Sequence, residues 1–305
     1  LLQRAQNIKL VYNNVLDESN SGEISRFGLQ LLHESGKSIQ RLNYDDKLIS
    51  IENKEIVIQN NNKVFEILKE FTANGKRSFS PAALNTFIRC SLKFYLNYIA
   101  KIRKKDELED EFSSSVFGLF LHKVLENIYV DLKKLPFIEK EHINKKIDSL
   151  DNIIHDTMLE MRHEDYISGG SEEIIKGIVK KYITSVLNND ILNAPFKCLF
   201  VEEKEEFVTY IEIETSAGKE KIRLNGIIDR IDKIGDRIKI IDYKTGLKKN
   251  RFNSVSSLFE FDTKDTSSHV LQTLFYSYIY MQSQNDKDLQ IKPSIYYTRF
   301  MNQQN

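Results

Sequence analysis

The segment that most constrains the fold is residues 226–246, GIIDRIDKIGDRIKIIDYKTG. Apolar residues dominate two short runs, 226–234 and 237–244, which predicts two β-strands. Only Gly235 and Asp236 separate them. A glycine at the first position of a two-residue loop favours a type II′ hairpin, because that position needs a positive φ. The two strands are therefore expected to pair directly with one another.

A two-residue loop also sets the register of the pair. It places Asp232 opposite Lys239 and Asp229 opposite Asp242, with opposed Cβ atoms roughly 4.5–5.5 Å apart. Lys244 is two residues beyond Asp242 and so points to the same face. Opposed like charges destabilise a sheet, whereas a divalent cation between them makes a binding site. This chemistry suits hydrolysis of a phosphodiester, although an ordinary charged surface hairpin remains the alternative because Asp-x-Lys is common.

Composition limits the classes of partner. The chain has 305 residues, enough for one large domain or two, and its 44 basic and 44 acidic residues give no net charge. Any nucleic-acid surface must then be a local patch, and Lys248, Lys249 and Arg251 are the best-placed candidates, with a solvated loop as the alternative. Two cysteines, Cys90 and Cys198, make no disulfide framework, which indicates a reducing compartment. The sequence has no apolar run long enough to span a membrane.

The order of the predicted elements favours an α/β (α+β) fold. Helices are predicted over 23–34, 63–71, 80–99, 116–135, 141–161, 171–189 and 270–282, and strands over 8–13, 47–60, 197–203, 205–215, 221–234, 237–244 and 293–300. A polar break at 72–78 predicts a boundary between a first domain, 1–77, and a second, 78–305. The chain begins without Met and already inside a periodic segment, so we expect a longer parent chain. We also expect the second domain to be truncated at its C-terminus.

The hairpin resembles the PD-(D/E)xK nuclease superfamily, and specifically its RecB-like nuclease domains. These carry G-x-x-D-R-x-D on one strand and D-Y-K-T-G on the next. The matching residues here are Gly226, Asp229, Arg230, Asp232, Asp242, Tyr243, Lys244, Thr245 and Gly246. The resemblance implies a restriction-endonuclease-like core, with a mixed, largely antiparallel central sheet flanked by helices and a helical insertion.

The resemblance also assigns roles within the hairpin. It implies that Asp229, Asp242 and the backbone carbonyl of Tyr243 bind Mg²⁺, for which Mn²⁺ can substitute, and that Lys244 is catalytic. The family further carries an upstream histidine, and GLFLHKVLE supplies His122. The resemblance makes His122 a metal ligand, while a histidine packed in the core is the alternative. Gly118 is one helical turn before it and is expected to leave room beside the imidazole.

A further pair is expected on the helix that follows the hairpin. Gln272 and Tyr276 are four residues apart and so share one helical face. The resemblance implies that this pair lies by the active site, where it contacts DNA or orients Lys244. Without the resemblance, Gln272 is an ordinary helix residue and Tyr276 belongs to the core.

The segment before His122 carries weaker signals. Residues 78–99 resemble the opening helix of the same family, with Ser91 where proline is usual. Some AddB-like members hold an iron–sulfur cluster through four cysteines, but only Cys90 matches, so this cluster is not possible within this chain. Cys90 is instead expected to be a small buried residue. Residues 1–70 faintly resemble the end of a helicase motor domain, with an accessory lobe as the alternative, and they have no phosphate-binding loop for an ATPase.

Together these features predict a metal-dependent DNA nuclease, expected to be an exonuclease, from a bacterial helicase–nuclease of double-strand-break repair and recombination. The implied partners are DNA and either a helicase subunit or the rest of a longer chain, with no membrane, in the cytoplasm at the nucleoid. The alternatives are a non-catalytic DNA-binding or assembly module that retains the fold, and a free-standing RecB-like nuclease.

Overall fold

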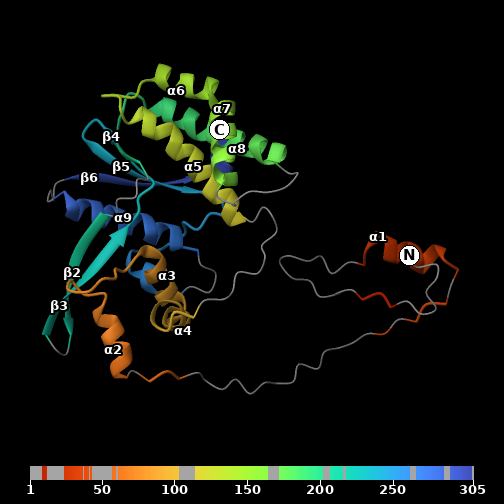
Figure 1. Cartoon of the computed structure of the whole chain (residues 1–305), viewed down its shortest axis with the longest axis horizontal. Coiled ribbons are helices and arrows are strands. Elements are labelled where there is room, and N and C mark those ends of the chain that lie inside the picture. Colours follow the sequence, from red (N-terminus) through yellow and green to blue (C-terminus); the bar gives the residue numbers. More distant parts are fainter. Residues whose placement is uncertain are drawn as a thin grey trace. The chain divides into compact units, whose positions relative to one another are not determined.

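The computed structural model describes residues 9–11, 24–36, 38–40, 42, 57–59, 61–102, 114–163, 172–201, 207–215, 218–261, 266–284 and 289–303 (Figure 1). The chain divides into two compact units, Leu1–Ile58 and Gln59–Asn305. The first contains α1 (Arg26–Glu34), as predicted, capped by the Ser25 hydroxyl, which accepts from the Gly28 N–H. The strands predicted over 8–13 and 47–60 lie largely outside the described residues. The boundary predicted after residue 77 stays a prediction.

The second unit begins with a small aromatic cluster. Its helices are α2 (Asn62–Lys69), α3 (Pro81–Arg89), α4 (Ser91–Phe94) and a π-helical turn (Tyr95–Ile99). Ser80 caps α3 and Pro81 occupies its first position, as predicted. One continuous helix over 80–99 is wrong, because Cys90 has an extended backbone, with φ −162°. The rings of Phe71 and Phe94 both stack on Phe79, with centroids 4.5 and 5.9 Å from it.

The central sheet has four strands in the order β1 (Lys197–Val201), β4 (Arg230–Ile234), β5 (Arg237–Lys244) and β6 (Gln290–Tyr297). β4 pairs antiparallel with both β1 and β5, and β6 pairs parallel with β5. β6 carries Pro293, which an edge strand tolerates because one side of it lacks a hydrogen-bonding neighbour. The predicted mixed, largely antiparallel sheet is confirmed.

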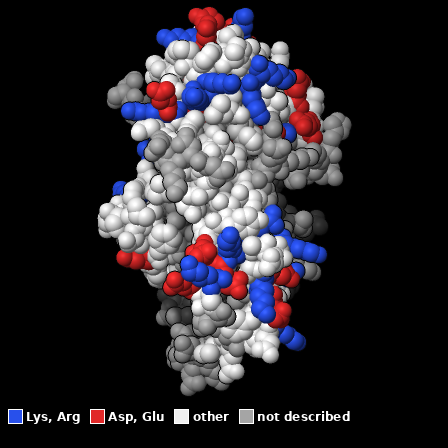
Figure 2. All heavy atoms as spheres, turned by 90° about the vertical axis from the view of Figure 1, so that its left-hand side faces the viewer, with Lys and Arg blue, Asp and Glu red and all other residues white. Residues whose placement is uncertain are grey.

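A separate two-stranded ribbon, β2 (Phe207–Thr215) with β3 (Gly218–Gly226), precedes β4. The prediction of one strand over 226–234 is therefore wrong. The chain bends at 227–229 as it leaves the ribbon and enters the central sheet, and the fully buried side chain of Ile228 anchors the bend. Acidic and basic side chains lie side by side over this ribbon (Figure 2), where Lys219 forms an ion pair of 2.8 Å with Glu212. The exposed face of the ribbon is thus a charge-paired surface.

Helices cover both faces of the central sheet (Figure 1). On one face lie α5 (Ser114–Leu132), α6 (Lys140–Asp148), α7 (Leu150–His163) and α8 (Glu172–Asn193), and on the other lies α9 (Ser268–Ser283). Short 3₁₀ helices span Ser256–Phe259 and Thr298–Gln303. The single helix predicted over 141–161 is two, because Ser149 ends α6 with its hydroxyl donating to the Lys145 carbonyl. None of the described helices is long and apolar enough to cross a bilayer.

Alternation along β5 decides what each face of the sheet presents. Ile241 and Tyr243 join the core formed with α5–α8, whereas Ile238 and Ile240 join the core formed with α9. Because neighbouring side chains of a strand point to opposite faces, Asp242 and Lys244 point toward the α9 side. Tyr243, between them in sequence, is directed to the helical layer of α5–α8.

Candidate functional site

The β4–β5 hairpin has the predicted register. Ile234 pairs with Arg237, and Asp232 with Lys239. Gly235 has φ +57°, and among the described residues the only non-glycine residue with a positive φ is Lys101. The second loop residue therefore has a negative φ, which fits the predicted type II′ turn and excludes type I′.

Asp229 lies just before β4. The regular ladder begins with Arg230 opposite Ile241, so the predicted Asp229–Asp242 pair falls one position beyond it. The Asp229 carboxylate faces the β5 backbone, where its Oδ2 accepts from the N–H of Tyr243 at 2.7 Å. This bond fixes a carboxylate, 9% exposed, at the open end of the hairpin.

Asp242 and Lys244 form the second part of the site. Lys244 Nζ lies 2.8 Å from Asp242 Oδ2 and 3.0 Å from Oδ1. The Asp242 side chain is only 1% exposed, whereas that of Lys244 is 20% exposed. The ammonium thus balances a buried carboxylate and still reaches solvent.

His122 brings α5 to the same point. Its Nε2 lies 3.1 Å from the carbonyl oxygen of Tyr243, to which it donates when the ring carries its proton there, and its Nδ1 lies 3.7 Å from Asp229 Oδ2. The expected role of Gly118 is wrong: a Cβ there would meet Thr245 Oγ1, at 3.6 Å, and no imidazole atom within 4 Å. Since 3.6 Å is an ordinary van der Waals contact, the packing of α5 beside the end of β5 leaves room for a Cβ at Gly118.

Gln272 and Tyr276 lie on α9, one turn apart, and Gln272 Nε2 donates to the Tyr276 hydroxyl at 2.9 Å. The Tyr276 ring covers Gly226, where a Cβ would lie only 2.7 Å from Cε1 of the ring. Gly226, three residues before Asp229, is thus required by close packing. The pair is held against the chain segment that leads into the site.

The loop after β5 presents Lys248, Lys249 and Arg251, which we call the basic loop. Lys248 and Arg251 are exposed and Lys249 is half-buried. The loop is tied down through its backbone, since the Lys249 N–H donates to the Tyr297 hydroxyl and the Arg251 N–H to the Thr266 carbonyl.

The donor atoms around Tyr243 are of the types that bind a divalent cation: an imidazole nitrogen, carboxylate oxygens and a backbone carbonyl. The described residues contain no ready-made group of three His, Cys, Asp or Glu side chains around one point. His122 and Asp229 meet, while the Asp242 carboxylate is turned to Lys244. The donor types fit a cation, with the Asp242 carboxylate paired to Lys244 in this structure.

A narrow pocket beside this site also contains residues that the sequence did not assign. It is lined by His122, Leu125, Glu126, Tyr129, Val201, Asp229, Arg230 and Tyr243. Glu126 ends the GLFLHKVLE segment but has no role predicted from the sequence; it is four residues after His122 and so shares its helix face. Burial raises the pKa of Asp232, next to this pocket, to about 6, although Arg230 opposes that rise.

The cysteines differ from expectation. Cys90 is exposed, so its predicted burial is wrong; its sulfur instead caps α4 by accepting from the Lys93 N–H. Cys198 is buried in β1, and burial raises the pKa of its thiol to about 12. The two are a surface thiol and a core thiol.

Residues 78–305 match the family model of the PD-(D/E)XK nuclease superfamily. Similar curated proteins include the AddB subunit of the ATP-dependent helicase/deoxyribonuclease of Streptococcus agalactiae serotype Ia, 27% identical over 182 residues, which are 59% of this chain and 15% of that protein. The corresponding protein of Clostridium perfringens strain SM101 is 26% identical over 229 residues, 71% of this chain and 18% of that protein. The corresponding protein of Thermoanaerobacter sp. strain X514 is 27% identical over 244 residues, which are 73% of this chain and 19% of that protein. The chain thus spans less than a fifth of the length of these relatives.

Proposed function

The chain belongs to the PD-(D/E)XK nuclease superfamily, and from this premise we propose that it is a metal-dependent deoxyribonuclease. The observation that carries the proposal is the meeting of His122, the Asp229 carboxylate and the Tyr243 carbonyl, with the Asp242–Lys244 pair on the same strand. The similarity of the chain to proteins named as deoxyribonuclease subunits supports DNA as the substrate.

His122, Asp229, Asp242 and the carbonyl oxygen of Tyr243 would hold the cation, which we propose to be Mg²⁺ with Mn²⁺ as a substitute. When bound, such a cation lowers the pKa of a water molecule and polarises a phosphoryl oxygen. The protein prepares this site by holding Asp229 on the Tyr243 N–H and His122 on the Tyr243 carbonyl.

Lys244 has two tasks in the proposed reaction. Water oxygen forms a bond to phosphorus while the bond from phosphorus to a sugar oxygen breaks, and the proton lost by water is balanced by one gained at the leaving oxygen. The Lys244 ammonium holds the attacking water and stabilises the charge that grows on the phosphate. Its 20% exposure lets it turn from Asp242 toward a bound substrate.

The DNA would be held beside the site. We propose that the basic loop contacts phosphates, because Lys248 and Arg251 are exposed just beyond the catalytic strand. The same loop exposes Phe252, and the 3₁₀ helix that follows it exposes Phe259, 49% and 55%, which gives this surface apolar area for the bases. Gln272 and Tyr276 support the site from α9.

The test is an assay of linear and circular DNA degradation with Mg²⁺, Mn²⁺ or a chelator. Asp229→Ala and Lys244→Ala should each reduce turnover by at least about 100-fold. Matched controls on the same hairpin are Asp236→Ala and Lys233→Ala, which alter exposed charges at its far end and should leave turnover unchanged. Full activity in Lys244→Ala, or in chelator, contradicts the proposal, provided circular dichroism shows each variant folded.

The basic loop has its own test, since the salt dependence of affinity counts phosphate contacts. A triple alanine variant of the loop should reduce the slope of log Kd against log salt by roughly 2–3, about 0.9 for each lost contact. Lys219→Ala with Lys221→Ala on the charge-paired ribbon is the control, and its slope should not change. An unchanged slope in the loop variant would remove the loop from the DNA surface.

We also propose that this nuclease unit works within an AddB-type helicase–nuclease of DNA repair, on the basis of the relatives' names. Residues 1–77 would then be the remnant of a motor domain or an accessory lobe. A non-catalytic module that keeps the fold is distinguished by calorimetric titration with Mn²⁺, since such a module would bind no metal that depends on His122.

A further inference from the structure

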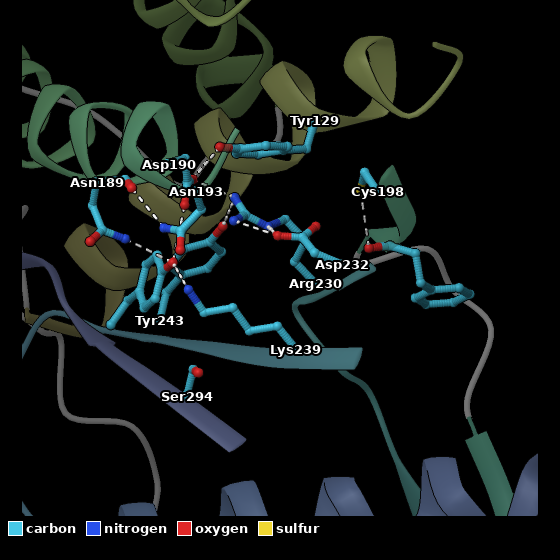
Figure 3. A network of polar contacts seen from close by, with 12 residues as sticks. Tyr129, Asn189, Asp190, Asn193, Cys198, Arg230, Asp232, Lys239, Tyr243 and Ser294 are labelled. Atoms are coloured by element: carbon cyan, nitrogen blue, oxygen red, sulfur yellow. Dashed lines mark hydrogen bonds and ion pairs between the residues drawn. The ribbon is translucent and has the colours of Figure 1, made fainter. Parts of the chain in front are cut away.

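A buried polar network lies under the hairpin, on the face opposite Asp242 and Lys244. We call it the Arg230 network. It consists of Tyr296 and of six residues labelled in Figure 3: Tyr129, Asp190, Arg230, Asp232, Lys239 and Tyr243. All seven are buried, with exposures between 1% and 8%. It joins α5 and α8 to three strands of the central sheet.

Arg230 is the centre of the network. Its guanidinium donates to Asp190 Oδ2 at 2.9 Å, to the Tyr243 hydroxyl at 2.8 Å and to Asp232 Oδ2 at 3.1 Å. It also lies over the Tyr129 ring, 3.9 Å from the centroid. Tyr129 in turn donates to Asp190, so the α8 carboxylate is fixed from two directions.

The second half of the network surrounds Asp190 and Lys239. The Lys239 ammonium donates to the Tyr296 hydroxyl at 2.7 Å, and that hydroxyl donates to Asp190 Oδ1 at 3.0 Å. Arg230 thus forms ion pairs with both carboxylates, whereas the buried Lys239 reaches Asp190 only through the Tyr296 hydroxyl.

Stability is a poor explanation for this arrangement. Removing two ion pairs from water costs several kcal/mol per ion, and apolar residues of similar volume often replace such groups without loss. A geometrical role is a better explanation, and Tyr243 indicates which geometry is held. Its N–H and carbonyl are the atoms that bind Asp229 and His122, while its hydroxyl is bound by Arg230.

We propose that Arg230 is a positioning residue that acts through Tyr243, and that Asp190 of α8 anchors it. The guanidinium fixes the Tyr243 ring from the helical side of the sheet. The Tyr243 peptide groups then hold His122 and Asp229 in place on the edge of the hairpin. The helical layer of α5–α8 thereby sets the geometry of the site, although none of its residues except His122 is proposed to bind the cation.

Two matched tyrosine variants test this proposal. Tyr243→Phe removes the hydroxyl bound by Arg230. Tyr296→Phe removes a hydroxyl of the same network that accepts from Lys239 and Asn189 and donates to Asp190. Each leaves the ring in place. Tyr243→Phe should lower kcat at least about tenfold with KM within twofold, because small misplacements of reacting groups are costly. Tyr296→Phe should lower the melting temperature at least as much as Tyr243→Phe does, yet leave kcat unchanged.

The kinetic readout depends on the proposed nuclease function, so a second readout is independent of it. The ring nitrogen chemical shifts of His122, measured by NMR in the chelated protein and assigned with His122→Gln, report its bond to the Tyr243 carbonyl. They should move in Tyr243→Phe and stay fixed in Tyr296→Phe. If the unaltered protein degrades no DNA, the proposed function fails, while these shifts still decide the positioning role.

Two results would overturn the inference. The first is a Tyr243→Phe variant with unaltered His122 shifts and unaltered kcat. The second is that Tyr243→Phe and Tyr296→Phe change kcat and the His122 shifts alike, each in proportion to its loss of stability. That result would make the network general packing rather than a device that positions the site.

Discussion

Arg230→Met is the most demanding test of the electrostatics of this fold. Methionine keeps much of the length of the arginine side chain and can still pack on Tyr129. It leaves the buried carboxylates of Asp190 and Asp232 without their shared cation. Breaking a buried ion pair by removing one partner costs about 3–5 kcal/mol. At about 2.1 cal/mol/K of unfolding entropy per residue, a unit of roughly 250 residues would lose about 6–10 °C in melting temperature.

The loss of stability caused by Arg230→Met should grow as pH rises. The pKa of Asp232 is about 6 in the native state against an ordinary 3.8, so native Asp232 binds a proton between these values where the unfolded chain does not. The free energy of unfolding therefore falls as pH rises through this window. Because the charge of Arg230 lowers the Asp232 pKa, the variant has a higher value still and continues to lose stability above pH 6. The destabilisation by Arg230→Met should be smaller at pH 5 than at pH 8.

Urea unfolding followed by circular dichroism at both pH values measures this difference. Arg237→Met, on the same hairpin but exposed, is the matched control and should change stability by less than about 0.5 kcal/mol. A destabilisation by Arg230→Met below about 1 kcal/mol at pH 8, or one equal at both pH values, would refute the argument that Arg230 neutralises buried ionised carboxylates.

Gly226→Ala should cost about 1–3 kcal/mol, because its Cβ would lie 2.7 Å from a Tyr276 ring carbon. Gly118→Ala should be neutral or stabilising, because the nearest atom to its Cβ would lie at 3.6 Å. Equal losses of melting temperature in Gly226→Ala and Gly118→Ala would contradict this packing. Cys90 should react within seconds with a chromogenic disulfide at pH 8, and Cys198 only after denaturation, since its thiol pKa is about 12. Two fast thiols in the native protein would show that β1 is not packed as described.

Much of the site followed from local rules. The register of β4 with β5 depends on two loop residues, so the opposition of Asp232 and Lys239 was predicted from a glycine that tolerates a positive φ. The spacing of Gln272 and Tyr276 on one helix face is equally local. Such features need only the neighbouring chain, and they survived comparison with the structure.

Other features depend on which element packs against which. The bend at 227–229 was missed because nothing in its residues says that β3 and β4 join different sheets. Asp190 carried no signal at all, since it lies in a long helix 40 residues before the hairpin, and only packing brings it to Arg230. The exposure of Cys90 likewise follows from the break after α3.

By itself, the sequence determined the chemical groups of the candidate site: an imidazole, two carboxylates and a lysine, with the hairpin that carries three of them. The tertiary structure alone decided that Tyr243 is the residue through which they meet, with Asp229 on its N–H, His122 on its carbonyl and Arg230 on its hydroxyl. The physical reason is that hydrogen bonds within a strand pair are local, whereas burial of Arg230 requires partners from α5, α8 and β5 to surround one charge.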